Sequence, residues 1–419
     1  METRGRLDKR TVFVDTMTVR HDEDITQDVF MIAGFGNSTV VVTKEGLVVI
    51  DVPVASSARL VETIRARTQA PTNTIIYTHG HADHAFTTAE LLEDASKRGH
   101  RRPTIIAHER VINRFNLYKE LEPYNWYINQ IQAGRGFARP TGKEKMVPDD
   151  IVYPDITYRD SMSFELGDLT FELYHYMGET DDGTWVWIPE LKIVVVGDLL
   201  EGDCPNIGNP FKLQRYEVEW AEALETIAGK NPDFLVPGHG PLRKGEKAKE
   251  WCLDTARYLR FFHDEIVRLL NKGYWIEDIL HMVKPPQELA SKRFLSGIYG
   301  CPTFMIHGIQ RRYSGWYNGN PSELFPSPSA DIAAEMIKLT NAKDLLKRAE
   351  QLKQEGNPQL ALHLVDFVIK GSKHRVQRKK ALLVKSQLLD DLAGVETNQI
   401  VRNIFLVGAE EAEQMARAL

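Results

Sequence analysis

A short stretch near residue 80 gathers four side chains of the kinds that bind metal ions. It reads Thr-His-Gly-His-Ala-Asp-His and carries the ligand-type residues His79, His81, Asp83 and His84. Zinc and similar borderline-soft divalent ions prefer imidazole nitrogen and carboxylate oxygen held close together. At this spacing His79 and His81 can face one ion while Asp83 and His84 face a second. A polar turn that caps the following helix is the alternative, but turns rarely need four ligand-type residues at this spacing.

Three more ligand-type residues occur farther along the chain, each directly after a glycine and close to the end of a β-rich run. They are Glu179, Asp198 and His239. Side chains from several strand ends meet when a site is built along one edge of a sheet. The seven residues together therefore predict a metal site at such an edge.

The elements that must position these residues alternate between strands and helices over the first part of the chain. β-branched and aromatic runs punctuated by glycine predict short strands, and apolar residues at helical spacing predict helices. The predicted strands are 29–32, 38–43, 46–51, 74–77, 104–107, 163–166, 169–174, 184–188, 193–196 and 234–236. The predicted helices of this part are 56–68, 85–97 and 218–228. This alternation predicts an α/β domain.

The pattern changes beyond about residue 246, where helical periodicity dominates. Gly356-Asn357-Pro358 is a stop-then-start signal between two of the helices, which are predicted at 342–355, 358–370, 376–391 and 399–418. We expect a domain limit near residue 250, with a catalytic domain at 1–250 and an all-helical domain at 251–419. Apolar helix faces that a hairpin cannot cover by itself predict a homodimer.

Composition narrows the classes of function and location. A chain of 419 residues is too long for one ordinary core, and its net charge of −6 provides no basic surface for nucleic acid or anionic membranes. Its three cysteines are widely spaced, which argues against a disulfide framework or a thiolate zinc site. The N-terminus lacks an apolar signal core, and no run is long enough to span a bilayer. We therefore expect a cytoplasmic protein with no membrane insertion and no nucleic-acid partner.

A less regular segment at 107–150 is dense in aromatic residues. They are Phe115, Tyr118, Tyr124, Trp126, Tyr127 and Phe137. Two interpretations stay open for them. They either fill a core or form a lid that gives the substrate an apolar wall, since segments between ligand loops are well placed for that role.

The ligand motifs resemble the metallo-β-lactamase fold superfamily of binuclear zinc hydrolases. His79 to His84 match its first motif one by one, Gly197-Asp198 matches the loop with the metal-bridging aspartate, and Gly238-His239 matches the last histidine. The resemblance implies an αββα sandwich, followed in this chain by the helical domain.

Within that superfamily the chain is similar to the alkylsulfatase branch. The usual third motif supplies a histidine after a glycine, but this chain has Gly178-Glu179, with Asp198 nineteen positions after the glutamate. In the branch a glutamate replaces that histidine, and another acidic residue bridges the metals at about this separation. The stretch Gly315–Pro321 and the helices after it also resemble the branch's dimerisation region.

The resemblance implies two Zn²⁺ ions, or other divalent transition metals, on the seven residues. One ion is expected on His79, His81 and Glu179 and the other on Asp83, His84 and His239, with Asp198 as the bridge. Three carboxylates against two divalent cations leave roughly one positive charge, and two such ions present hydroxide to an ester by lowering the pKa of bound water. Asp83 and Asp198 are the predicted catalytic residues.

Two features separate this chain from the long-chain alkylsulfatases. Those enzymes carry a His-Asn pair and then an arginine downstream of the bridging acid, whereas this chain has Pro205-Asn206 followed by Lys212 and Arg215. They also carry a third, sterol-carrier-like domain, before which this chain stops. The negative charge of Glu179 makes the metal site less electrophilic than a neutral histidine would. A sulfate ester therefore needs a lysine or arginine side chain to bind its negative charge. We predict Asn206, Lys212 and Arg215 as substrate contacts, with solvated surface charge as the alternative for the two cations.

The remaining histidines are expected to serve other purposes. His175 lies four positions before Glu179, and strand alternation favours a place behind the ligands or in the core over metal contact. His307, close to Arg311 and Arg312, is the strongest candidate among the rest for a substrate contact.

Three functions are consistent with these residues. The first is a zinc-dependent hydrolase of alkyl or related sulfuric esters that uses metal-bound hydroxide on a small-molecule substrate. The second acts on a lactone, thioester, β-lactam or phosphodiester, although the 41 positions between Asp198 and His239 are too few for the inserted domain of nuclease relatives. The third is a non-catalytic metal-binding relative, which the complete ligand set disfavours. The sequence favours the first.

Overall fold

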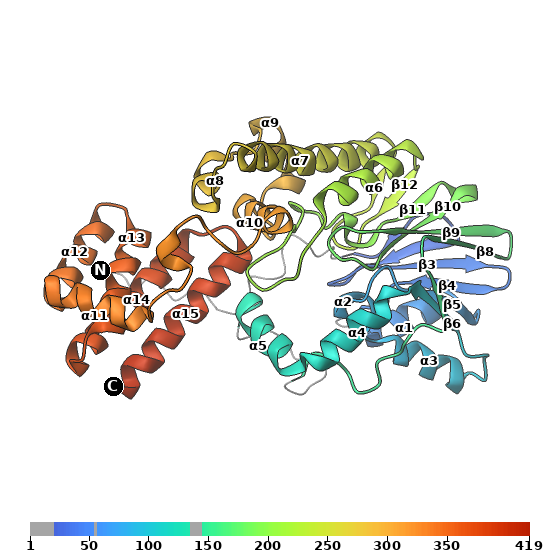
Figure 1. Cartoon of the computed structure of the whole chain (residues 1–419). Coiled ribbons are helices and arrows are strands. Elements are labelled where there is room, and N and C mark those ends of the chain that lie inside the picture. The colour runs from blue at the N-terminus through green and yellow to red at the C-terminus, as the bar shows by residue number, and fades with distance from the viewer. Residues whose placement is uncertain (1–20, 54–56, 135–144) are drawn as a thin grey trace. The chain divides into compact units, whose positions relative to one another are not determined.

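The structure is a computed structural model that describes residues 21–53, 57–134 and 145–419. The chain divides into two compact units (Figure 1). One unit holds the β-sheets and comprises the described residues from 21 to 126 and from 145 to 315, while the other is helical and comprises residues 127–134 and 316–419.

The first sheet has seven strands in sequence order. They are β1 (Glu23–Asp24), β2 (Val29–Ile32), β3 (Ser38–Thr43), β4 (Gly46–Ile50), β5 (Thr72–Ile76), β6 (Thr104–His108) and β7 (Ile156–Tyr158). The strands from β1 to β4 pair antiparallel, and those from β4 to β7 pair parallel. The parallel half places the carboxyl ends of β4, β5 and β6 at one edge, which is where parallel sheets present functional loops.

The second sheet has six strands in the order β13-β12-β11-β10-β9-β8. They are β8 (Ser161–Leu166), β9 (Leu169–Tyr176), β10 (Gly183–Ile188), β11 (Ile193–Val195), β12 (Phe234–Val236) and β13 (Arg243–Lys244). Only β11 and β12 pair parallel. Their carboxyl ends therefore also lie side by side at one edge.

The two sheets pack against each other through one apolar face and against helices through the other. In β4, Leu47 and Val49 face a core shared with helices, while Val48 and Ile50 face a core shared with the second sheet. Alternate residues of a strand point to opposite faces, so a strand that is apolar throughout must be covered twice. The result is the αββα sandwich that the resemblance implied, which confirms the predicted fold class.

Helices cover the outer faces of the two sheets (Figure 1). Those of the first side are α1 (Ser57–Arg67), α2 (Ala82–Ala85), α3 (Thr88–Lys97) and α4 (Arg110–Glu120). Those of the second side are α6 (Glu217–Gly229), α7 (Glu246–Leu270), α8 (Ile276–Met282), α9 (Gln287–Ala290) and α10 (Pro302–Tyr313). The unit extends past the limit expected near residue 250 because Trp251 and Leu259 of α7 share one core with Trp185 and Leu235 of the second sheet.

The segment at 107–150 contains two helices that the sequence pattern did not predict, α4 and α5 (Glu122–Gln132). Phe115 of α4 is fully buried and packs against the rings of Tyr77 and Phe86, so this aromatic residue belongs to the core. Tyr124 and Tyr127 of α5 are 50% and 58% exposed. Phe137 lies outside the described residues, and the lid stays a prediction.

The helix expected at 85–97 is interrupted, since α2 ends at Ala85 and α3 begins at Thr88. The backbone N–H of Val52 donates to the carbonyl of His84, and the hydroxyl of Thr87 donates to the carbonyl of Val52. These bonds hold the end of the histidine stretch against the end of β4 and so interrupt the helix there.

The helical unit contains α11 (Ser329–Leu339), α12 (Ala342–Gln354), α13 (Pro358–Gly371), α14 (Arg375–Val395) and α15 (Gln399–Ala418). The last four confirm the predicted helices, and Pro358 stands at the first position of α13 as such starts favour. Leu346, Ala349, Val365 and Val368 are buried in one core. Within the described residues, no helix is long and apolar enough to cross a bilayer.

Candidate metal centre

The seven candidate ligands all follow the ends of central strands. The histidine stretch follows β5, Glu179 follows β9, Asp198 follows β11 and His239 follows β12. The close approach of two loops needs Gly238, because a side-chain carbon at this position would lie 2.1 Å from a carboxylate oxygen of Asp198. The topology thus brings residues from four separate loops to one place.

The first group consists of His79, His81, Glu179 and Asp198, whose ligand atoms all lie within 4.8 Å of one another. Nε2 of His79 lies 2.9 Å from Nδ1 of His81 and 3.9 Å from Oε2 of Glu179. Nδ1 of His81 lies 3.4 Å from the same glutamate oxygen. Nitrogen and oxygen atoms that converge at such separations leave room for one ion with ligand distances near 2 Å.

The second group consists of Asp83, His84 and His239. Nε2 of His84 lies 3.3 Å from Nε2 of His239, and the latter lies 3.4 Å from Oδ2 of Asp83. Both imidazoles are buried, with at most 3% of the side chain exposed. This group is a second convergent set of one carboxylate and two imidazoles.

Asp198 lies between the two groups and turns a different oxygen to each. Its Oδ2 is 3.4 Å from Nε2 of His79, and its Oδ1 is 3.2 Å from Nε2 of His84 and 3.5 Å from Nε2 of His239. Oδ1 of Asp198 and Oε2 of Glu179 are buried, and no described residue donates a hydrogen bond to either. Buried carboxylate oxygens without donors are costly, so these atoms and the N/O donor set fit a pair of divalent ions.

Asp51, directly after β4, orients two of the histidines. It accepts hydrogen bonds from the backbone N–H of Thr78 at 2.7 Å, from the Thr78 hydroxyl at 2.7 Å and from Nδ1 of His84 at 2.8 Å. The Thr78 oxygen, having donated its hydrogen, accepts from Nδ1 of His79 at 3.1 Å. Each of these rings therefore carries its hydrogen on Nδ1 and turns Nε2 toward the site, as residues behind metal ligands commonly arrange.

Burial and the charges of the site shift the pKa values of its histidines in opposite directions. Burial lowers the pKa of His81 to about 4 despite the nearby Glu179. Burial also disfavours a charge on His239, but Asp198 and Asp83 outweigh it and raise the pKa to about 10. The carboxylates Asp198, Asp51 and Asp83 likewise raise the pKa of the buried His84 well above its ordinary value. In the absence of bound ions, His84 and His239 are therefore protonated at neutral pH, and their positive charges balance the negative charges of the nearby carboxylates.

The predicted substrate contacts differ from one another in their surroundings. Arg215 is 3% exposed, and its guanidinium pairs with Oε1 of Glu179 and donates to the carbonyl of Asn206 at 2.5 Å. Asn206 is itself fully buried. Lys212 is half-buried, and burial followed by the charge of Arg215 lowers its pKa to about 8, while Glu179 and Asp83 act in the opposite direction. Among the described residues, no carboxylate forms an ion pair with Lys212.

Several residues that surround the candidate ligands were not predicted from the sequence, because they belong to none of the ligand motifs. Asp51 was detectable in principle, as an acidic residue directly after a buried strand. Asp182 is fully buried beside the histidine stretch, and Glu201 is 3% exposed, where burial, Glu179 and Asp198 raise the pKa of its carboxyl. Arg114, which pairs with Asp182, carries no sequence signal because it lies on a helix 68 positions away.

The other histidines lie outside both ligand groups. His175 stacks on His108 with the ring centres 3.7 Å apart, and its Nδ1 lies 3.0 Å from the carbonyl of Gly183. His175 is in neither ligand group, which agrees with the expectation that it does not bind metal. His307 is in neither group, and its substrate contact stays a prediction.

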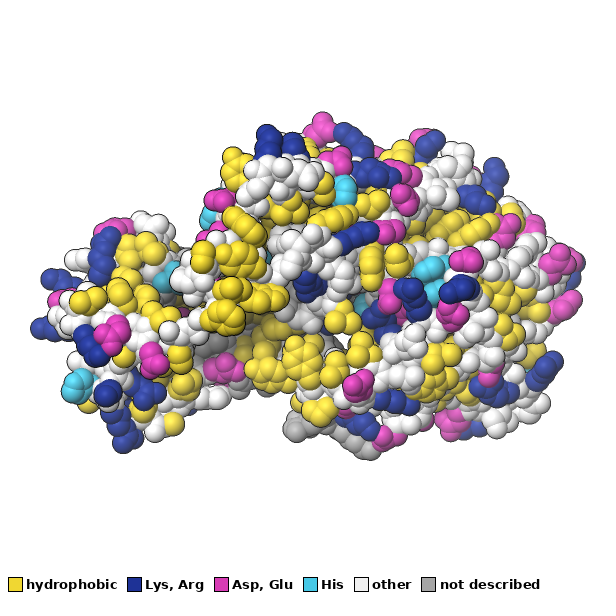
Figure 2. Space-filling model, viewed as in Figure 1, with side chains coloured by type: hydrophobic (Ala, Val, Ile, Leu, Met, Phe, Trp, Pro, Cys, Tyr) yellow, Lys and Arg dark blue, Asp and Glu magenta, His cyan; other side chains and the backbone are white. Residues whose placement is uncertain are grey.

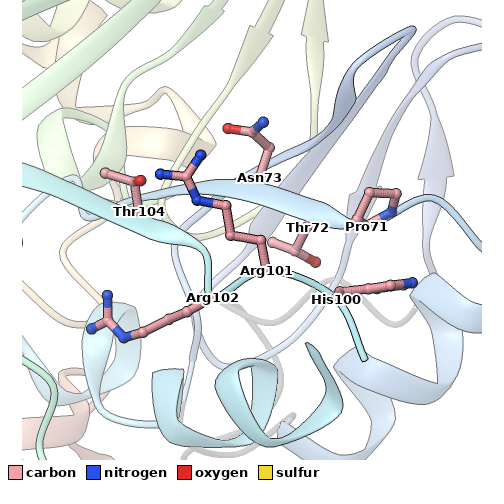
Figure 3. A pocket seen from close by; sticks show the side chains of 7 residues that line it. All are labelled: Pro71, Thr72, Asn73, His100, Arg101, Arg102 and Thr104. Carbon is pink, nitrogen blue, oxygen red and sulfur yellow. The ribbon is translucent and has the colours of Figure 1, made fainter. Parts of the chain in front are cut away.

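A hollow of about 220 Å³ lies at the amino ends of β5 and β6, whereas the histidine stretch follows the carboxyl end of β5 (Figure 3). It is lined by Pro71, Thr72, Asn73, His100, Arg101, Arg102 and Thr104. Thr72 and Thr104 are the first residues of their strands, whereas the histidine stretch follows the last residue of β5. The hollow is therefore no part of the candidate metal centre.

Two family models match this chain. One, described as the metallo-beta-lactamase superfamily, matches residues 31–239, and the other, described as alkyl sulfatase dimerisation, matches residues 275–415. Residues 31–239 belong to the metallo-β-lactamase superfamily. The first match spans all seven candidate ligands, and the second runs from just before α8 into α15.

The chain is similar to alkylsulfatases along most of its length. It is 26% identical to a linear primary-alkylsulfatase of Pseudomonas sp., over 88% of this chain and 72% of that protein. It is 23% identical to the alkyl/aryl-sulfatase BDS1 of Saccharomyces cerevisiae, over 93% of this chain and 63% of that protein. The solved structure of the inverting sec-alkylsulfatase Pisa1 from Pseudomonas sp. has the same fold, with a TM-score of 0.80 at 21% identity.

The Pisa1 match covers 94% of this chain and 65% of the other. The chain thus spans less than two thirds of the length of two of these three relatives.

Proposed function

We propose that this chain is a hydrolase of sulfuric esters with alkyl sulfates as substrates. It depends on two divalent metal ions, for which Zn²⁺ is the first candidate. The bridging position of Asp198 is the observation that carries the proposal, because one carboxylate faces two otherwise complete ligand groups. The names of the similar proteins, which are linear primary-alkylsulfatase and alkyl/aryl-sulfatase, support the ester class.

The residues of the chain have separate tasks under this proposal. His79, His81 and Glu179 would hold one ion, Asp83, His84 and His239 the other, and Asp198 both. When bound, such ions act as Lewis acids and lower the pKa of a coordinated water molecule, so that a nucleophile is available near neutral pH. Asp51 and Thr78 keep the two imidazoles in the tautomer that presents Nε2.

Lys212 is the cation best placed to bind the sulfate group. Arg215 was an equal candidate in the sequence, but its guanidinium is buried against Glu179 and the Asn206 carbonyl. Lys212 is half-buried, and after burial and Arg215 the next charges that act on the pKa of its ammonium are Glu179 and Asp83, which supports a role for Lys212 at the candidate centre. An ammonium without a carboxylate partner can bind an anionic substrate at lower cost than a guanidinium that must first leave an ion pair.

Sulfate release by protein of known metal content tests the proposal. Dodecyl sulfate and a shorter alkyl sulfate are supplied to the full chain, and the Asp198→Ala variant serves as the control. We expect release from at least one substrate and loss of release in the variant. No release from protein that holds two ions per chain would contradict the sulfatase and direct the search to lactones, thioesters and other esters.

We also propose that the chain forms a homodimer. The match to the dimerisation model supports this assembly. The sequence predicted dimerisation through apolar faces of α12 and α13, but the apolar residues of these helices are largely buried within the helical unit. The apolar surface for a dimer therefore has to come from another helix. Ile332, Met336 and Leu339 of α11 share one exposed face at 47%, 37% and 80% exposure, and hydrophobic side chains are visible on the surface of the molecule (Figure 2). A cytoplasmic location stays a prediction.

A further inference from the structure

Arg114 connects helix α4 to two loops of the candidate metal centre. Its side chain is 11% exposed. Nε donates to Oδ2 of Asp182 at 2.9 Å, and Nη2 donates to Oδ1 of Asp181 at 2.5 Å. Both aspartates belong to the loop between β9 and β10, which also carries Glu179. A guanidinium presents its N–H groups in a rigid planar fork, so two bonds in different directions fix it in one orientation.

The same carboxylate reaches the histidine loop. Oδ2 of Asp182 also accepts the backbone N–H of Gly80 at 3.0 Å. Gly80 stands between His79 and His81, so the orientation of its peptide group sets the positions of both imidazoles. A side-chain carbon at residue 80 would lie 3.0 Å from Cδ of Arg114 and 3.0 Å from Oδ2 of Asp182, which shows how closely the three residues pack.

The carboxylate of Asp182 is fully buried, and such a charge persists only with a partner. Arg114 supplies the positive charge that lies against it. Without this partner, Asp182 has to protonate or turn toward water, and either change weakens its bond to Gly80. The first ligand group, which takes two histidines from one loop and Glu179 from the other, depends on this connection.

We propose that Arg114 is a positioning residue for the ion held by His79, His81 and Glu179, and not for the ion held by Asp83, His84 and His239. Arg114 contacts neither the substrate nor a ligand side chain in this role. The inference rests on metal binding as set out in the proposed function, but not on the sulfatase activity.

Arg110 provides a matched control one helical turn earlier. It also pairs with Asp181, at 3.5 Å, but its side chain is 43% exposed, and no contact of it with Asp182 is found among the described residues. An exposed pair of this kind contributes little to stability. Arg110→Gln therefore removes one arginine from the same helix without breaking the connection to Gly80.

The test is a titration of metal-free protein with Co²⁺ and, in a separate experiment, with Zn²⁺. Calorimetry measures the binding of both ions, and visible absorption also measures the binding of Co²⁺. Wild type and Arg110→Gln are expected to bind two ions with equal affinities. Arg114→Gln is expected to bind one ion as wild type does and the other about 10- to 100-fold more weakly, the usual effect of losing support behind a ligand. Arg114→Lys keeps the charge but not the fork, and we expect an intermediate loss.

Each result decides between support and rejection. Two unchanged affinities in folded Arg114→Gln would overturn the inference, and so would an equal loss at both sites. Where Arg114→Gln does not fold, Arg114→Lys decides by the same criterion. Wild-type protein that binds no metal would instead refute the proposed function, so the two failures are distinguishable.

Discussion

The guanidinium of Arg215 lies against the carboxylate of Glu179, and both side chains are at least 95% buried. Glu179 therefore offers one oxygen to the first ligand group and the other to an arginine. Because Glu179 stands where related motifs carry a neutral histidine, its additional negative charge needs compensation inside the protein. Arg215 supplies it, and this is why the proposed sulfate contact is Lys212 and not Arg215.

Replacing Arg215 by glutamine should destabilise the metal-free protein more than the metal-loaded protein. The change leaves Glu179 buried without its partner, which typically costs about 3–5 kcal/mol of unfolding free energy. Bound divalent cations would offset part of that cost. Denaturant unfolding with a chelator and with excess Zn²⁺ measures both values, and equal losses in the two conditions would contradict this account.

Replacing Lys212 by glutamine should lower kcat/KM for an alkyl sulfate about 10- to 100-fold, since a hydrogen bond to a charged group is worth about 1.5–3 kcal/mol. The wild-type value should also fall as the pH rises through about 8, because burial and Arg215 lower the pKa of Lys212 to about 8 and the ammonium is lost above it. Lys212→Arg, which stays charged, should move that fall to higher pH. A profile that is the same in all three proteins would exclude Lys212 from substrate binding.

Metal binding to chelator-treated protein should release protons. Burial opposes the charge, but the surrounding carboxylates raise the pKa of His239 to about 10 and that of His84 well above its ordinary value, so both rings are protonated near pH 7 without ions. A coordinating imidazole has to give up its proton, so about two protons should leave and the apparent affinity should rise with pH. Calorimetry in buffers of different ionisation enthalpy counts the protons, and binding without release would contradict the electrostatics of the second group.

Charged residues on the exposed face of α11 should separate the proposed dimer. Met336→Glu and Leu339→Glu place carboxylates on side chains that are 37% and 80% exposed, so the fold of a single chain is expected to persist. Sedimentation velocity at micromolar concentration should show a dimer for wild type and a monomer for the double variant. Val376→Glu, on α14 at 81% exposure, is the control for a surface change elsewhere on the helical unit. A wild-type monomer would contradict the assembly itself.

The sequence by itself determined the candidate ligands and most of the strands and helices. The histidine stretch is local, so its spacing alone predicts ligands among His79 to His84, and the glycine before Glu179, Asp198 and His239 marks the other loops. The structure brings these residues into two groups that could hold metal ions. Central strands such as β4 and β10 are apolar on both faces, a pattern that a covered sheet requires. Helices α4 and α5 escaped prediction because only two residues of each helix are buried, so their apolar period is short.

Only the tertiary structure decided which charges face each other. Arg215 and Glu179 are 36 positions apart, and Arg114 and Asp182 are 68 positions apart, so no spacing rule relates them. A buried charge takes the nearest partner that the fold provides, and that choice depends on side-chain direction and burial rather than on residue type. For this reason the sequence could not separate Lys212 from Arg215, while the fold placed Arg215 inside an ion pair with Glu179. The proposed role of Lys212 in substrate binding rests on that difference.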